Sequence, residues 1–239
     1  MSGLASDSAL RLRQVSRVLV PLLIVVIGVT IFAHDRLMAG QTTAQSGTGS
    51  RLKGFDLGAV PAPGFSLTDQ NSAAISLTAL VGRPVVLTFL YTHCPDECPL
   101  TAEKLRTTAQ ALGDRASSAV WLAVSIDPVG DTPQAARDFV AKHRLTGMLH
   151  FLVGSQRQLH PIWSAYHIAI ERTDTAAAGA TPKSAGLVHS GAVYLIDAKS
   201  RERVLYTSGF APDDLASDLR TLLGGERGKA LLGAPLGGK

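Results

Sequence analysis

Aromatic side chains are scarce in this chain of 239 residues, at 5% of the total. The formal net charge is +4 at pH 7, and no run of basic residues is interleaved with aromatic ones. Nucleic-acid-binding domains show their function through basic patches of that kind. The sequence therefore predicts no nucleic-acid partner.

Cysteine is rarer still, because Cys94 and Cys98 are the only two in the chain. They lie together in the stretch Tyr91–Pro99, directly after the apolar run Val85–Leu90, which is typical of a buried strand. Two thiols at a strand-to-helix turn can close into a disulfide or bind a soft metal as thiolates. All cysteine chemistry of this protein must come from this one motif.

The motif also lacks the spacing of two redox sites. Thioredoxin-type oxidoreductases use Cys-x-x-Cys, whereas three residues separate Cys94 from Cys98. The Thr/Ser-x-x-Cys loop of peroxide-reducing redoxins is absent, because Tyr91 lies three residues before Cys94. The longer loop permits a disulfide and also lets both sulfurs point at one ion. A purely structural disulfide is disfavoured, because so short a loop constrains the unfolded chain little.

Pro99 predicts a helix that begins near this residue and runs to Leu112, with Cys98 at or beside the N-cap. The N-terminus of a helix carries partial positive charge, which favours a thiolate over a thiol. Soft thiolates select Cu(I), and a neutral imidazole is the usual third ligand of such a pair.

Charge is missing from one long stretch near the N-terminus, the apolar run Val18–Ala33, which follows three arginines, Arg11, Arg13 and Arg17. As a helix it would span about 24 Å, slightly less than a bilayer core of about 30 Å. The run is longer than the core of a cleavable signal peptide, and the small-residue site at residues 38–40 is poor. An uncleaved signal anchor is therefore favoured over a removed signal peptide.

The basic flank predicts that residues 1–17 stay in the cytoplasm and that residues 18–34 cross the inner (cytoplasmic) membrane once. Residues 35–55 have the composition of a flexible tether, and the Gly-rich residues 225–239 that of a loose tail. Residues 56–224 are expected to form one globular domain in the periplasm. A cysteine pair in this oxidising compartment becomes a disulfide unless a reductant or a metal holds it.

Strands and helices are expected to alternate along this domain. The predicted strands lie at residues 63–67, 74–77, 85–90, 119–126, 149–153, 192–196 and 203–206, and the predicted helices at 99–112, 132–143, from 155 onward and 212–224. Residues 171–184 are expected to form a surface loop. Such alternation predicts an α/β sandwich with a central mixed sheet. The cysteine pair after the first central strand fits a thioredoxin-like layout.

Seven histidines are candidates for the third ligand. His189 directly precedes the strand at 192–196, in a strand-edge connection that can reach the cysteine loop. His93 adjoins Cys94, but on a strand its ring would point to the opposite face. The others show no metal spacing and are expected to be surface or capping residues: His34, His143, His150, His160 and His167. A lone histidine is more often structural, so spacing leaves both roles open for His189.

Three stretches together resemble the Sco/SenC family: Tyr91–Pro99, Val124–Pro133 and the segment from His189 to Asp197. They occur in the family's order, and the likeness covers about Pro61 to Leu223. Members are membrane-tethered thioredoxin-like proteins that bind copper through two cysteines and a histidine and help to build the Cu A centre of cytochrome c oxidase. The resemblance therefore implies copper, as Cu(I) or Cu(II), on Cys94, Cys98 and His189.

The resemblance also points to Asp127 as an aspartate close to the site, although a cap on the turn before Pro128 explains it equally well. One departure is Val188, where many members have an acidic residue before the histidine. The implied partners are subunit II of cytochrome c oxidase or another copper-dependent acceptor, the membrane, and another copper chaperone as donor.

Two functions from different classes remain. The first is a membrane-anchored copper metallochaperone for oxidase assembly. The alternative is a thiol–disulfide oxidoreductase in which Cys94 and Cys98 are catalytic and reduce the copper-ligand cysteines of the acceptor.

Overall fold

The computed structural model describes residues 52–172, 187–189 and 191–232, with side chains for 52–170 and 191–224. The predicted anchor, most of the tether and most of the predicted loop at 171–184 lie outside the described residues. Within the described ranges, no helix combines the length and the apolar character needed to cross a membrane.

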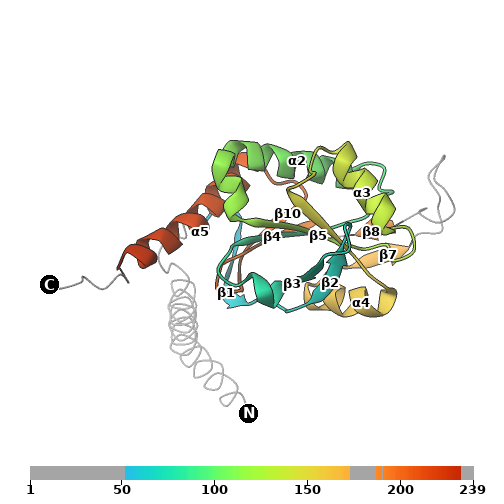
Figure 1. Ribbon diagram of the computed structural model, residues 1–239, viewed down its shortest axis with the longest axis horizontal. Coiled ribbons are helices and arrows are strands. Elements are labelled where there is room, and N and C mark those ends of the chain that lie inside the picture. Colours follow the sequence, from blue (N-terminus) through green and yellow to red (C-terminus); the bar gives the residue numbers. More distant parts are fainter. Residues whose placement is uncertain (1–51, 173–186, 190, 233–239) are drawn as a thin grey trace, which may run out of the picture. The chain divides into compact units, whose positions relative to one another are not determined.

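A central mixed sheet organises the domain (Figure 1). Its strand order is β1-β10-β9-β4-β5-β6-β2-β3, in which β4, β5 and β6 run parallel and the other neighbours are antiparallel. The strands are β1 (Phe55–Pro61), β2 (Ser66–Asp69), β3 (Ala74–Ser76), β4 (Val85–Leu90), β5 (Val120–Ser125), β6 (Leu149–Val153), β9 (Ala192–Ile196) and β10 (Arg201–Thr207).

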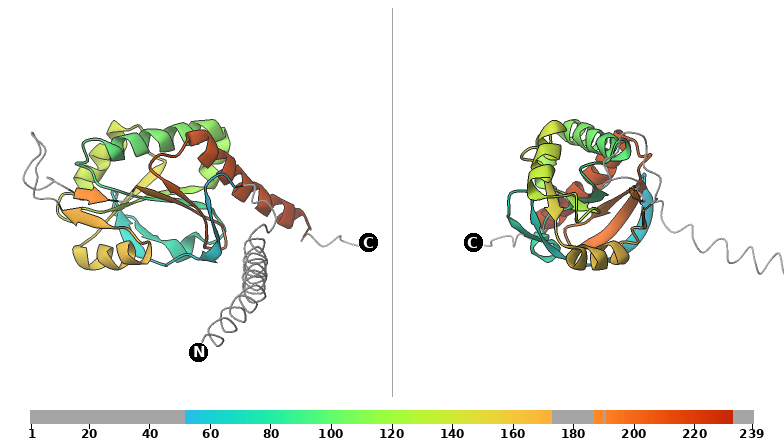
Figure 2. Two further views of the ribbon diagram at one scale, coloured as in Figure 1. Left: turned by 180° about the vertical axis from the view of Figure 1, so that it is seen from behind. Right: turned by 90° about the vertical axis from the view of Figure 1, so that its right-hand side faces the viewer.

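Helices cover both faces of this sheet. Figures 1 and 2 show α2 and α3 on one face and α4 on the other. The α-helices are α2 (Glu97–Leu112), α3 (Pro133–Lys142), α4 (Gln156–Ala165) and α5 (Pro212–Leu232), and the 3-10 helices are η2 (Leu77–Leu80) and η3 (Gly113–Ser118). The predicted α/β sandwich with a central mixed sheet is confirmed.

The central strands are apolar along their length because helices bury both of their faces. Every residue of β4, β5 and β9 is buried. Among the described side chains, three aromatic residues meet beneath β4, since the ring of Tyr166 lies 5.6 Å from that of Phe89 and 5.3 Å from that of Tyr194. This packing makes the central strands a rigid base for the loops that follow them.

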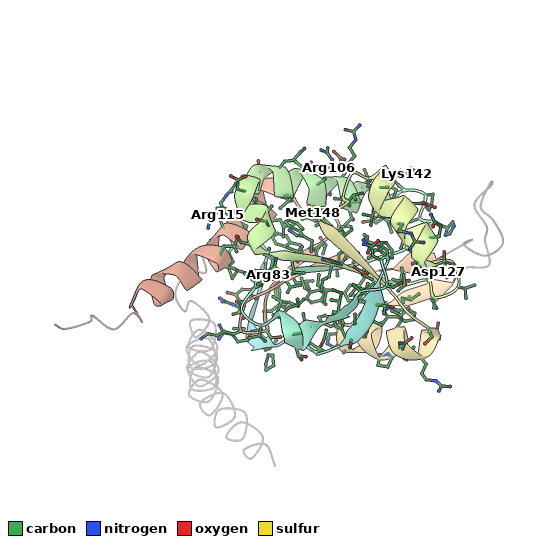
Figure 3. The ribbon with its side chains drawn as sticks, in the orientation of Figure 1. Arg83, Arg106, Arg115, Asp127, Lys142 and Met148 are labelled. Carbon is green, nitrogen blue, oxygen red and sulfur yellow. The ribbon has the colours of Figure 1, made fainter. Side chains whose placement is uncertain are left out.

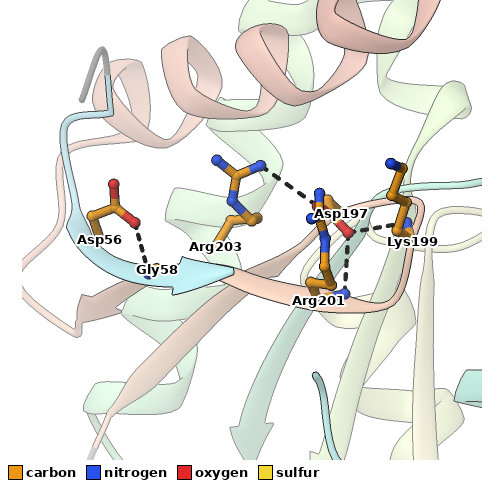
Figure 4. Close-up of polar contacts among 6 residues, drawn as sticks. All are labelled: Asp56, Gly58, Asp197, Lys199, Arg201 and Arg203. Carbon is orange, nitrogen blue, oxygen red and sulfur yellow. Dashed lines mark hydrogen bonds and ion pairs between the residues drawn. The ribbon is translucent and has the colours of Figure 1, made fainter. Parts of the chain in front are cut away.

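Two aspartates shape the backbone of β1 and of the turn between β9 and β10 (Figure 4). Asp197 closes the β9–β10 turn by accepting hydrogen bonds from the backbone N–H groups of Lys199 (2.9 Å) and Arg201 (3.1 Å) and from the Arg201 side chain. Asp56 accepts one from Gly58 N at 2.9 Å, where Gly58 has a positive φ of 70°. The pairing of β1 with β10 shifts register between Asp56 and Val60. This irregularity removes the alternation of apolar and polar residues that is typical of a strand, so β1 was not predicted from the sequence.

Two helix boundaries differ from the prediction. α2 begins at Glu97 with Asp96 as N-cap, so Cys98 lies in the first turn and Pro99 one residue further in. The N–H groups of the first helical turn need no partner within the helix, so proline is tolerated throughout that turn. α5 continues to Leu232, past the predicted end at Gly224. A glycine interrupts a helix only when it adopts the left-handed conformation, and otherwise costs about 1 kcal/mol.

A buried carboxylate, Asp131, holds the cysteine loop against the end of β5. Its Oδ1 accepts hydrogen bonds from Thr92 N (2.8 Å) and Thr92 Oγ1 (2.7 Å), and its Oδ2 accepts one from Ser125 Oγ (2.5 Å). Burial raises the pKa of Asp131 to about 6, although these hydrogen bonds act in the opposite direction. The loop that carries Cys94 is therefore tied to the sheet by side chains as well as by the backbone.

Asp131 should make the metal-free, reduced chain less stable as the pH rises from about 4 to about 6. In this window the folded state keeps a proton that the unfolded state, with an aspartate pKa near 3.9, has released. The lost free energy of unfolding is on the order of 3 kcal/mol for a shift of about two units. Asp131→Asn keeps an acceptor for Thr92 and can donate its amide N–H to Ser125 Oγ, and it should remove this pH-dependent contribution.

Urea unfolding of the wild type and of Asp131→Asn, followed between pH 4 and pH 7, measures the difference. We expect the stability of the variant relative to wild type to increase with pH. Parallel curves for the two proteins would show that Asp131 titrates as an ordinary aspartate.

Candidate functional site

Three segments that contain predicted site residues meet at one edge of the sheet. β4 and β5 are parallel and pair Leu90 with Ser125, so the cysteine loop and the turn at Asp127 leave the same edge. β9 is antiparallel to β4, and Val193 pairs with Thr88. The Thr88 side chain also donates a hydrogen bond from its Oγ1 to Ala192 O at 2.9 Å. The connection from His189 into β9 therefore arrives where the cysteine loop begins.

The two cysteines are thiols of different accessibility. Cys94 is half-buried, whereas Cys98 is fully buried, and no disulfide joins them in the described structure. The backbone N–H of Cys98 donates to Cys94 Sγ at 3.3 Å, and the two thiol groups are also hydrogen-bonded to each other. Both sulfurs thus lie close together at the first turn of α2, with Cys94 on the outside.

Protons are held tightly in this metal-free site. The hydrogen bond with Cys94, together with burial, raises the pKa of Cys98 well above its ordinary value. Burial and the neighbouring Cys94 likewise raise the pKa of Tyr91. The helix N-terminus is expected to favour the thiolate, whereas the contact between the two sulfurs and burial favour the protonated form of Cys98 in the metal-free protein. A metal ion would have to displace these protons.

Asp127 and His93 both have side chains next to Gly130. A Cβ placed on Gly130 would come within 2.3 Å of Asp127 Oδ2 and 3.2 Å of His93 Nδ1, so only glycine fits beside them. Asp127 is buried and accepts a hydrogen bond from Val129 N at 3.3 Å, as the turn-cap interpretation predicts. Its negative charge also contributes to the raised pKa of Tyr91, the residue that begins the cysteine loop.

His93 is not on a strand, because β4 ends at Leu90. The strand geometry on which the expectation for its ring rested is therefore absent, and His93 lines the same pocket as Cys94. The ring is exposed, and its Nδ1 lies 3.0 Å from Thr92 Oγ1. Together with Asp131, His93 is part of a side-chain network that the spacing of the sequence did not reveal. The only feature of the sequence that pointed to this network was the group of polar residues directly after β4 and β5, which end at the same side of the sheet.

The backbone of His189 ends β8 (Leu187–His189), which pairs with β7 (Ile170–Arg172) and places His189 opposite Ile170. This small hairpin replaces the start of the predicted loop and the predicted strand-edge connection. The side chain of His189 lies outside the described residues. Figure 3 shows Asp127 at the end of the sheet where Figure 1 shows β7 and β8.

Gly191, two residues after His189, is packed against the start of α2. A Cβ on Gly191 would lie 3.0 Å from Glu97 Oε1 and 2.6 Å from Ser208 Cβ. Glu97 directly precedes Cys98 in the chain. The segment that carries His189 therefore passes beside the cysteine motif.

A pocket of about 230 Å³ opens beside the outer cysteine, between the cysteine loop and α3. Its walls include Thr92, His93, Cys94, Phe139, Lys142 and His143. Cys98 does not line it. Any molecule that approaches through this pocket reaches Cys94 first.

Two of the other histidines make contacts that support the fold within the described part of the chain. His143 caps α3 and packs against Phe139 with ring centroids 4.4 Å apart, and His150 pairs with Asp69. His160 and His167 are exposed, and His34 lies outside the described residues. Among the described side chains, which exclude that of His189, no three His, Cys, Asp or Glu residues are grouped as metal ligands.

Comparison with known proteins gives one consistent family. The SCO2-like protein of Rickettsia conorii is 26% identical over 156 residues, which cover 65% of this chain and 74% of that protein. Protein SenC of Rhodobacter capsulatus is 24% identical over 162 residues, which cover 66% and 69%.

The solved structure of Bradyrhizobium japonicum ScoI with copper bound superposes with a TM-score of 0.59 at 27% identity. It covers 69% of this chain and 99% of that one. The family model described as SCO1/SenC matches residues 58–224, which include both cysteines, Asp127 and His189. This match spans more than half of the sequence, and the chain therefore belongs to the SCO1/SenC family.

Proposed function

We propose that this chain is a copper metallochaperone in which Cys94, Cys98 and His189 hold the ion as cargo for the Cu A centre of cytochrome c oxidase. The observation that carries the proposal is the adjacent pair of thiols, one accessible and one buried, beside the segment that leads from His189. A relative of 27% identity has been solved with copper bound.

The donor set fits copper better than a hard cation. Two thiolates are soft ligands that select Cu(I), and an imidazole is a common third ligand for either oxidation state. Binding would release the protons that the metal-free thiols hold, so copper affinity should rise with pH. Asp127 would act near the ion through its negative charge rather than as a ligand.

The difference in burial between the cysteines suggests an order of transfer. Cys94 is half-buried beside the open pocket, whereas Cys98 is enclosed. An incoming thiolate of the acceptor, such as subunit II of the oxidase, would displace Cys94 first and Cys98 later. A donor chaperone would load the site through the same opening. Each step exchanges one ligand of a low-coordinate ion.

The chain would act at a membrane. We propose that residues 18–34 anchor it in the inner membrane with residues 1–17 in the cytoplasm, and that residues 35–55 tether the domain of 56–224 in the periplasm. The uncharged run after three arginines supports this placement. Mass measurement of the membrane-extracted protein decides whether the anchor is retained.

A second candidate function is thiol–disulfide exchange. The closeness of the two thiols favours it, because neighbouring sulfurs need little movement to form a disulfide. In this function Cys94 would attack the acceptor's disulfide and Cys98 would resolve the mixed disulfide. The two functions differ in their need for His189, since exchange uses the cysteines alone.

His189→Ala should weaken Cu(I) binding to the full, reduced chain at least tenfold, because a three-coordinate site loses one donor. Anaerobic competition with a Cu(I) chelator measures the affinity. His160→Ala removes an exposed histidine from α4 and should bind copper as the wild type does. Equal affinity of the two variants would remove His189 from the ligand set without affecting the family assignment.

Cells that carry His189→Ala should lose oxidase activity about as severely as cells with Cys94→Ser and Cys98→Ser combined. The reason is that cargo binding needs all three side chains. The comparison requires equal protein abundance, an unchanged reduction potential of the cysteine pair and low external copper. Oxidase activity close to wild type in the His189→Ala cells would favour the exchange function instead.

A further inference from the structure

A second pocket lies at the opposite edge of the sheet from the cysteines. It has a volume of about 460 Å³, and it is bordered by the residues that precede or begin β4, β5 and β6. Its lining includes Arg83, Asp114, Trp121, Met148 and His150. Figure 3 shows Arg83 and Met148 toward one end of the sheet and Asp127 at the other.

The imidazole of His150 is oriented by a buried carboxylate. His150 Nδ1 lies 2.9 Å from Asp69 Oδ2, and Asp69 is only 2% exposed. Asp69 Oδ1 in turn accepts hydrogen bonds from Asn71 N (2.8 Å) and Ala73 N (2.9 Å). The Asp69 carboxylate therefore has a fixed position, and Nδ1 of His150 is engaged in a hydrogen bond with it.

Asp69 stays ionised over the physiological range. Its burial alone would raise its pKa, but the hydrogen bonds from His150 and from the two backbone N–H groups outweigh this and lower the pKa. An ionised Asp69 accepts the Nδ1–H of His150, so the neutral ring keeps its lone pair on Nε2. The His150 side chain is 41% exposed, and metal-binding histidines commonly use such a carboxylate partner.

Met148 supplies a second donor two residues earlier in the chain. It is half-buried and lines the same pocket as His150. Its thioether sulfur is a soft, neutral ligand that favours Cu(I) over hard cations. A thioether and an imidazole together match a soft ion of low coordination number.

A guanidinium at the pocket repels a divalent ion more strongly than a monovalent one. The Arg83 guanidinium is held there by hydrogen bonds from its NH2 group to Ser117 O (2.9 Å) and Ala119 O (3.1 Å). Asp114 in the lining and the ionised Asp69 behind His150 offset this charge, so the preference for a soft ion rests mainly on the thioether. The repulsion by a guanidinium is twice as large for a divalent ion as for a monovalent ion at the same distance.

We propose that Met148 and His150 form a second metal site, selective for a soft monovalent cation such as Cu(I) or Ag(I). It shares no residue with the cysteine site and does not depend on the function proposed for that site. In a chain that also binds at Cys94 and Cys98, the two sites would load independently from opposite edges of the sheet.

Ag(I) titration of the full chain tests the proposal, with Cys94→Ser, Cys98→Ser and His189→Ala present to remove the first site. The methionine methyl groups are labelled with ¹³C and followed by NMR, and a competing ligand gives the affinity. We expect one equivalent of Ag(I) to shift the Met148 methyl signal. Met148→Leu, which conserves volume, and His150→Gln should each weaken binding at least tenfold, whereas His160→Gln should not.

An unmoved Met148 signal at saturating Ag(I), or an unchanged affinity in Met148→Leu, would overturn the proposal and leave the Asp69–His150 pair a purely structural contact. Binding of Zn(II) at least as tight as that of Ag(I) would overturn the selectivity. Met148→Leu keeps the test decisive if His150→Gln fails to fold without its contact to Asp69.

Discussion

The register of β4 with its two neighbours is the constraint on which the site depends. Parallel pairing with β5 brings the cysteine loop and the Asp127 turn out at one edge, and antiparallel pairing with β9 returns the chain from His189 to that edge. Because all three strands are buried on both faces, a shift of one residue would exchange the side chains that pack against the two helical layers and disrupt the close packing of the core. Core packing thus fixes the positions of the loops that carry the chemistry.

On this rigid base, the cysteine loop is shaped by polar contacts that the core does not supply. Asp131 holds Thr92, and Gly130 leaves room for the side chains of Asp127 and His93 beside it. The resulting site is closed around Cys98 and open at Cys94. This asymmetry suits a protein that must keep an ion and also release it, since the outer ligand can be exchanged while the inner one stays in place.

Much of this arrangement follows from the sequence. Val85–Leu90 and Leu149–Val153 are strands with the predicted ends, because their apolar runs are bounded by turn residues, and Thr132 caps α3 as its residue type predicts. The hydrogen bonds by which Asp131 joins the cysteine loop to β5 could not be predicted. Its partners Thr92 and Ser125 are brought together by strand pairing, which the spacing of residues in the sequence does not show. The β7–β8 hairpin was missed because the polar segment between its strands resembles a plain surface loop.

The most direct test of the central claim is the ligand set of copper in the cysteine site. X-ray absorption of the full chain carrying Met148→Leu and loaded with less than one equivalent of Cu(I) counts the sulfur and nitrogen neighbours of the ion. The account predicts two sulfur ligands and one nitrogen ligand, and loss of the nitrogen in His189→Ala. A site with fewer than two sulfur ligands, or a nitrogen ligand that persists in that variant, would contradict it.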